Sequence, residues 1–138
     1  MHILLATDAQ WILNEVVAVL GTPSTTFTVV SDGRDVDSAI KTQVPDIAIL
    51  DLQSGSMGAM AVAMNLRLDH SSGNAPLVPI LFLLDRAADV HLARRSGANG
   101  WIIKPLDALR LRRAVTMVLA GDEYREGLPT IAAALTNQ

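Results

Sequence analysis

The sequence predicts an α/β protein with a doubly wound parallel sheet, and two observations carry this prediction. Short apolar runs rich in Ile, Leu and Val alternate along the chain with longer stretches that can form helices. Several runs are almost continuously hydrophobic, which is typical of parallel strands covered by crossover helices on both faces. The predicted strands are HILLA (2–6), FTVV (27–30), DIAIL (46–50), VPILFLL (78–84) and GWII (100–103).

Five stretches between and after these runs are expected to be helices. Glycine or proline follows most of them, and both residues end helices readily. The expected ranges are 10–20 before Gly21, 35–43 before Pro45, 57–68, 87–96 before Gly97, and 106–120 before Gly121.

Length and composition indicate one domain. The chain has 138 residues, of which half are hydrophobic, so one core and one domain over residues 1–120 are expected, followed by a tail or short extra helix at 121–138. The net charge of -3 argues against direct nucleic acid binding. The chain has no cysteine, and we see no signal peptide and no apolar run near the ~20 residues of a membrane helix, so we expect a cytoplasmic protein that does not enter a membrane.

Charged residues follow four of the predicted strands, namely Asp8, Asp51, Asp85 and Lys104. The carboxyl ends of parallel strands meet at one edge of the sheet, so these side chains should lie together. Asp8 and Asp51 would repel each other unless a cation intervenes, and Mg²⁺ is the natural partner for two carboxylates and a phosphate. Asp51 could accept a phosphoryl group while Lys104 stabilises its charge.

Structural roles remain as alternatives for these residues. An aspartate after a strand is often a helix N-cap, which suits Asp8 before the helix at Gln10 and is our preferred interpretation for Asp85. No helix start follows Asp51 directly, so its position favours chemistry. Lys104 precedes Pro105 and could simply be a solvated strand end.

Three segments resemble the receiver domain of bacterial two-component response regulators, and the resemblance extends from about residue 2 to residue 120. ILLATD (3–8) matches the first strand and acidic pocket, and PDIAILDLQSGSMGAM (45–60) matches the phosphoacceptor strand and its loop. SGANGWIIKPLD (96–107) is the most specific segment, with Trp101 and Lys104-Pro105 at the family spacing.

The resemblance implies a flavodoxin-like fold, with a five-stranded parallel sheet in the order 2-1-3-4-5 flanked by five helices. It implies that Asp51 is the phosphoacceptor, that Asp8, Asp51 and the backbone carbonyl of Gln53 bind Mg²⁺, and that Lys104 binds the phosphoryl group. In the family a sensor histidine kinase or phosphotransfer protein donates that group. The receiver itself catalyses the transfer, so no further enzyme activity is expected.

The sequence departs from the family pattern at two positions. Thr7 replaces the first of two adjacent acids, which should weaken Mg²⁺ binding. Leu84 stands where the family has a Thr or Ser that hydrogen-bonds the phosphoryl group, a bond worth roughly 1.5 to 3 kcal/mol. Without this donor, Trp101 is not expected to switch, and it would be either a fixed surface anchor or an ordinary edge-strand aromatic.

These departures leave two hypotheses. The chain is either a single-domain receiver phosphorylated on Asp51 or a phosphorylation-independent pseudo-receiver, a dimerisation or protein-binding module. A homodimer or a target would use the face of the fourth helix, fifth strand and fifth helix, which carries His91, Arg94, Arg95, Trp101, Asp107 and Arg110. A flavodoxin-like cofactor binder is disfavoured, because TDAQW (7–11) places an acid where an anionic cofactor would bind.

Overall fold

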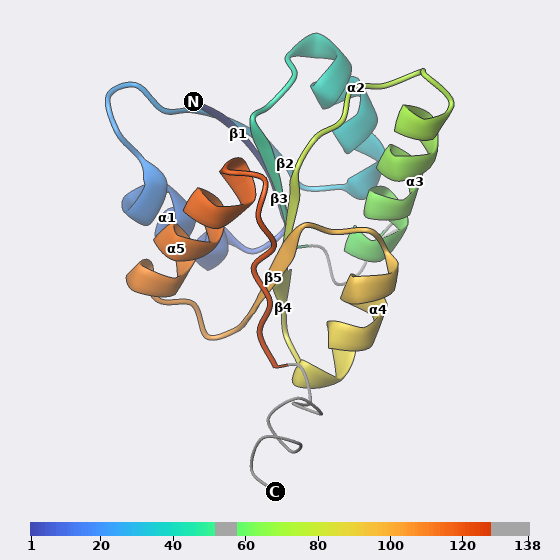
Figure 1. Cartoon of the computed structure of the whole chain (residues 1–138). Helices are drawn as coiled ribbons and strands as arrows, with labels where there is room; N and C mark the ends of the chain where they lie inside the picture. Colours follow the sequence, from blue (N-terminus) through green and yellow to red (C-terminus); the bar gives the residue numbers. More distant parts are fainter. Residues whose placement is uncertain (52–57, 128–138) are drawn as a thin grey trace, which may run out of the picture.

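A parallel five-stranded sheet forms the centre of the protein. The structure is a computed structural model and describes residues 1–51 and 58–127. The strands are β1 (His2–Thr7), β2 (Thr26–Val30), β3 (Ile47–Asp51), β4 (Ile80–Leu84) and β5 (Gly100–Ile103). They lie in the order β2-β1-β3-β4-β5 (Figure 1), which confirms the expected topology.

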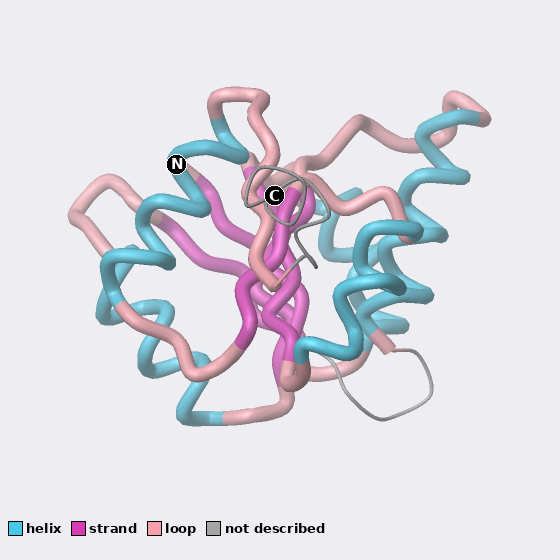
Figure 2. The backbone as a smooth tube through the Cα atoms, turned by 60° about the horizontal axis from the view of Figure 1, so that its bottom comes forward, coloured by secondary structure: helices cyan, strands magenta, loops and turns pink. Residues whose placement is uncertain are grey.

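Helices cover both faces of the sheet. Figure 2 shows the strands between two sets of helices. One set is α1 (Gln10–Leu20) and α5 (Ala108–Leu119), and the other is α2 (Val36–Thr42), α3 (Ala59–Ser71) and α4 (Val90–Arg95). The short 3₁₀ turns η1 (Gly33–Asp35) and η2 (Ala87–Asp89) precede α2 and α4. The range expected for the first helix is confirmed, whereas the fourth is divided into η2 and α4.

Alternate residues of each strand enter two separate cores, because successive side chains of a strand point to opposite faces. Leu4, Leu50 and Phe82 belong to the core under α2, α3 and α4. Ile49 and Leu81 belong to the core under α1 and α5. Burial on both faces explains why the sequences of β1, β3 and β4 are almost continuously apolar, whereas β2 at the edge is partly exposed.

The chain continues past α5 as an extended segment, residues 122–127, which we call the strap. Gly121 turns the chain after α5 with φ of 87°, a conformation that favours glycine. The strap then runs beside β5: the Tyr124 amide donates to the Asn99 carbonyl at 3.1 Å, and the Trp101 amide donates to the Tyr124 carbonyl at 3.0 Å. Figure 1 shows the strap in red crossing beside β5. The strap therefore pairs with the edge strand.

The helices described here are all too short to be membrane-spanning candidates. This holds for residues 1–51 and 58–127.

Candidate functional site

Asp51 is the last residue of β3, and its side chain is buried at the carboxyl edge of the sheet. Only 1% of its surface is exposed. Thr7, the last residue of β1, is its partner in the strand register. The Thr7 hydroxyl donates to Asp51 Oδ2 at 2.7 Å, and it accepts the Ala9 amide at 3.1 Å. The hydroxyl thus links the end of β1 to the start of α1 and supplies one partner for the buried carboxylate.

Lys104 supplies the second partner of Asp51. It follows β5, and its amide donates to the Leu84 carbonyl at 2.8 Å, which places it beside the end of β4. The Lys104 ammonium donates to Asp51 Oδ1 and, at 2.8 Å, to Asp85 Oδ1. Burial alone would lower the pKa of Lys104, but hydrogen bonds and charge attraction from these two carboxylates outweigh burial and raise it. Lys104 therefore remains a cation between two acids.

Trp11 borders this cluster on the side of α1. The Lys104 ammonium lies 5.6 Å from the centroid of the indole ring, within the range of a cation–π interaction. The Trp11 side chain is nevertheless 52% exposed. Our sequence reasoning did not identify Trp11, although an aromatic residue in the first helical turn after a strand-end aspartate indicates a side chain close to the site. Trp11 therefore places an aromatic ring beside the Lys104 ammonium.

The N-cap interpretations of two aspartates are wrong. Ala9 is the N-cap of α1, with no side-chain cap hydrogen bond, and Asp8 is an exposed side chain beside the site. Asp85 does not cap the fourth helical segment either, because η2 has Arg86 at its N-cap position. The Asp85 carboxylate instead pairs with Lys104, which follows β5, and an ion pair is stronger than a hydrogen bond to a neutral backbone amide.

The comparisons with known proteins agree with this fold. No family model matches the chain. Over 92 residues the chain is 35% identical to the regulatory protein LuxO of Vibrio vulnificus, an alignment covering 63% of this chain and 18% of that protein. The chain therefore spans only about a fifth of the length of that relative.

Solved structures extend the likeness across most of the chain. The chemotaxis response regulator CheY4 of Vibrio cholerae has a TM-score of 0.73 at 21% identity, covering 85% of this chain and 97% of that one. The receiver domain of NtrX from Brucella abortus has a TM-score of 0.73 at 22% identity, covering 86% and 98%. The chain therefore has the fold of a response regulator receiver domain.

The two residues predicted at the switch positions lie in one core. Leu84, at the end of β4, and Trp101, in β5, are both buried in the core under α2, α3 and α4. Trp101 is not the surface anchor that we considered, because the strap covers it: its indole nitrogen donates to the Glu126 carbonyl at 2.7 Å. The interpretation was wrong because the covering segment lies beyond the region of family resemblance.

The strap also engages the face expected to form an interface. Glu126 accepts hydrogen bonds from the Ile103 amide and Arg110 Nε, both at 2.9 Å, and from the Tyr124 hydroxyl at 2.6 Å. Burial alone would raise the pKa of Glu126, but these hydrogen bonds outweigh it and lower the pKa. The hydrogen bonds that Arg110 donates to Glu126 and to Asp107, and the charges of these two carboxylates, raise the pKa of Arg110. Our sequence reasoning did not identify Glu126.

The other residues expected at this interface differ in their surroundings. Asp107 caps α5 by accepting the Arg110 amide at 2.9 Å. His91, Arg94 and Arg95 are exposed on α4. An interface on this face of the protein remains a prediction.

The expected Mg²⁺ ligands are only partly described. Gln53 lies outside the described residues. Within the two described ranges, no group of three or more His, Asp or Glu side chains is arranged to hold a metal ion. The metal-binding roles of Asp8 and Asp51 therefore remain a prediction.

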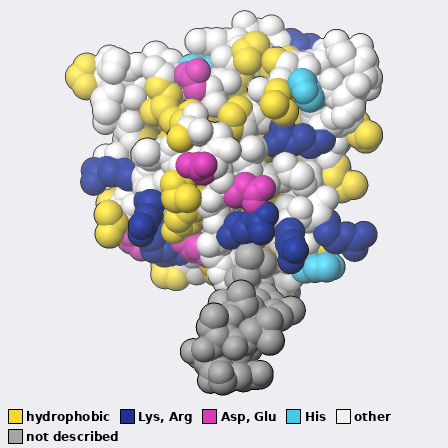
Figure 3. Space-filling model, viewed as in Figure 1, with side chains coloured by type: hydrophobic (Ala, Val, Ile, Leu, Met, Phe, Trp, Pro, Cys, Tyr) yellow, Lys and Arg dark blue, Asp and Glu magenta, His cyan; other side chains and the backbone are white. Residues whose placement is uncertain are grey.

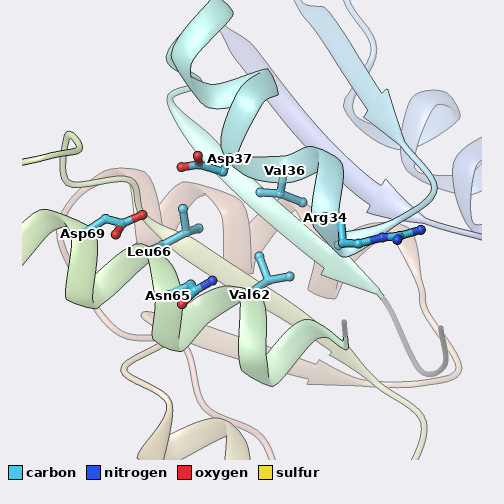
Figure 4. A pocket seen from close by; sticks show the side chains of 8 residues that line it. Arg34, Val36, Asp37, Val62, Asn65, Leu66 and Asp69 are labelled. Carbon is cyan, nitrogen blue, oxygen red and sulfur yellow. The ribbon is translucent and has the colours of Figure 1, made fainter. Parts of the chain in front are cut away.

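A separate hollow of about 170 Å³ lies between α2 and α3. Figure 4 shows that Asp37 and Asp69 come from the two helices on either side of it, with Asn65 between apolar side chains. None of the strand-end residues lines this hollow. It is therefore distinct from the Asp51 site.

Proposed function

We propose that this receiver accepts a phosphoryl group on Asp51 from a sensor histidine kinase or a phosphotransfer protein, and that it signals through protein contacts. The observation that carries the proposal is the ion pair between the Asp51 carboxylate and the Lys104 ammonium at the carboxyl edge of the sheet. Ligands of open parallel sheets bind at this edge. We place this activity in the cytoplasm and expect no direct contact with nucleic acid.

The proposed chemistry uses the groups of this site in distinct roles. An Asp51 oxygen would attack the phosphorus atom as the bond to the donor nitrogen breaks, leaving an aspartyl phosphate and a neutral imidazole. Lys104 would move from Asp51 onto a phosphoryl oxygen and stabilise its charge. Receiver domains usually bind Mg²⁺. Carboxylate oxygens are the ligands that Mg²⁺ prefers, so Asp8 and Asp51 would hold it, and it would neutralise charge on the phosphoryl group.

Mass measurement tests the proposal directly. The chain is incubated with Mg²⁺ and acetyl phosphate, and the intact mass is compared for the wild type, Asp51→Asn and Asp85→Asn. We expect one added phosphoryl group on the wild type and on Asp85→Asn, which keeps Asp51, and none on Asp51→Asn. An unmodified wild type, or a modified Asp51→Asn, would contradict phosphorylation at this residue.

A phosphorylation-independent pseudo-receiver is the second candidate, and a specific contact favours it. The Thr7 hydroxyl occupies Asp51 Oδ2, and Leu84 brings no hydrogen-bond donor to the site. Such a module would bind a partner or dimerise through α4, β5 and α5, with the strap already covering part of β5. Self-association measured with and without acetyl phosphate separates the candidates, because the pseudo-receiver requires the two affinities to be equal.

A further inference from the structure

Two hollows lie between α3 and α4, and we call the space that they mark the α3–α4 groove. The first, of about 370 Å³, is lined by Met60 at the start of α3, Leu84, and Leu92 of α4, among others. The second, of about 300 Å³, is lined by Leu68 of α3 and Arg95 of α4, among others. In both helices, residues earlier in the helix line the first hollow and residues later in the helix line the second. The first hollow therefore lies nearer the carboxyl edge of the sheet, and the second lies farther from it.

The α3 wall of the groove carries an apolar stripe. Met60, Met64 and Leu68 are four residues apart, a spacing that places side chains in a row on one helix face. Met64 and Leu68 are 55% and 64% exposed, and Leu92 on the α4 side is 53% exposed. Contiguous exposed apolar side chains mark binding surfaces, and flexible methionines adapt to varied partners. In Figure 3, hydrophobic side chains appear at the right-hand edge, over α3.

Positive charge is concentrated at the second hollow. Arg67 and Arg95 line it, and no carboxylate does. The Arg67 guanidinium donates to three neutral acceptors, the Gly97 and Val78 carbonyls and the Asn99 side-chain oxygen. Burial lowers the pKa of Arg67, as expected for a desolvated cation. Arg95 forms no ion pair within the described part of the chain, so neither charge is neutralised there.

The opposite end of the groove is electrically balanced. Arg86 pairs with Asp89 at 2.8 Å, and Asp85 pairs with Lys104 at 2.8 Å. Uncompensated positive charge therefore lies at one end of the groove only. This asymmetry would orient a bound partner.

We propose that the α3–α4 groove binds an amphipathic helix of a partner protein, whose apolar side chains lie on the Met64–Leu68–Leu92 surface and whose carboxylates face Arg67 and Arg95. The 13 residues of α3 span about 20 Å at 1.5 Å per residue. That length accommodates the anchors that a helix presents at i, i+4 and i+7. The Met64–Leu68–Leu92 surface includes neither Asp51 nor Lys104, and binding there does not require phosphorylation of Asp51.

Peptide selection tests both the surface and the chemistry of the partner. A displayed library of helical peptides of about 14 residues, matched to α3, keeps an apolar stripe and randomises the other positions. It is selected on the immobilised full chain, and the winners are titrated against variants. We expect winners rich in Asp and Glu at one end. Their affinity should fall at least tenfold with Leu68→Glu and severalfold with Arg95→Glu.

Leu109→Glu is the matched control, because Leu109 is 74% exposed at the start of α5, outside the groove. It should bind the winners as the wild type does, and so should Asp51→Asn. Thermal unfolding verifies that each variant is folded. Absence of enrichment, winners rich in Lys and Arg, or equal affinity for Leu68→Glu would overturn the proposal. So would a wild-type dimer that Leu68→Glu dissociates, since a second copy would then occupy the groove.

Discussion

Glu126 is the residue through which the strap is fastened, so its neutralisation is the sharpest test of the described structure. One carboxylate accepts hydrogen bonds from a backbone amide of β5, a guanidinium of α5 and a phenol of the strap itself. Glu126→Gln keeps the size of the side chain but removes its charge. We expect the strap to loosen and the protein to lose stability, because the Arg110 guanidinium loses one of its two anionic partners and keeps only Asp107.

The expected loss can be bounded from the surroundings of the pair. Hydrogen bonds to charged groups contribute about 1.5 to 3 kcal/mol when buried. The Arg110 side chain is 32% exposed and that of Glu126 is 14% exposed, so solvent weakens the attraction. We therefore expect Glu126→Gln to lower the free energy of unfolding by about 1 to 2 kcal/mol. For a domain of this size that corresponds to a melting temperature lower by roughly 3 to 8 °C.

Urea and thermal unfolding measure this loss, and the strap supplies a matched control. Glu123 pairs with Arg125 at the surface, where both side chains are largely exposed. Glu123→Gln makes the same chemical change in the same segment and should shift stability by less than about 0.5 kcal/mol. If Glu126→Gln unfolds at the same urea concentration as Glu123→Gln, the strap does not stabilise the domain in the way described.

Three further outcomes are expected. Folding lowers the pKa of Glu126, so its carboxylate contributes fully to the stability of the folded protein above the ordinary pKa of 4.5 and loses this contribution as the pH falls through the lowered pKa. The difference in melting temperature between wild type and Glu126→Gln should therefore shrink below pH 4.5. A difference that stays constant with pH would refute this expectation. Trp101→Ala removes a buried ring and should cost about 3 to 5 kcal/mol in urea unfolding, whereas a solvated aromatic would cost far less. Leu84→Thr should cost about 2 to 3 kcal/mol of stability but strengthen binding of beryllofluoride, a mimic of aspartyl phosphate, about tenfold or more through a hydrogen bond to a charged group; unchanged affinity would show that residue 84 does not face the phosphoryl position.

The strand ends could be placed from the sequence because a general property of parallel sheets positions them. Asp51 and Lys104 follow apolar runs, and the carboxyl ends of parallel strands meet at one edge whatever the details of packing. Helix positions could also be predicted, because apolar periodicity and a glycine after the last helical residue are local features of the sequence. The structure brings Asp51, Asp85 and Lys104 together, as this reasoning required.

The errors arose where a distant partner competed with a local preference. Asp85 was interpreted as a cap because caps are local, but Lys104 offers a stronger charged partner across the sheet edge. The strap could not be predicted from the sequence for a related reason. Residues 122–127 show no periodic pattern of apolar residues. Glu126 contacts Arg110 of α5, which lies 16 residues earlier in the chain, so no local pattern indicates this contact. Pattern reading detects periodicity, and it does not detect a single side chain that several elements share.

The strap also makes the two margins of the sheet unequal. A strand at the border of a sheet exposes amide and carbonyl groups that can recruit another chain. At β5 the amides of Trp101 and Ile103 are already taken by the strap. β2, at the opposite border, pairs with β1 on one side, and its exposed positions include Val29. Any association of two molecules by strand addition would therefore begin at β2, and covalently tethering the strap to β5 would leave such association unchanged.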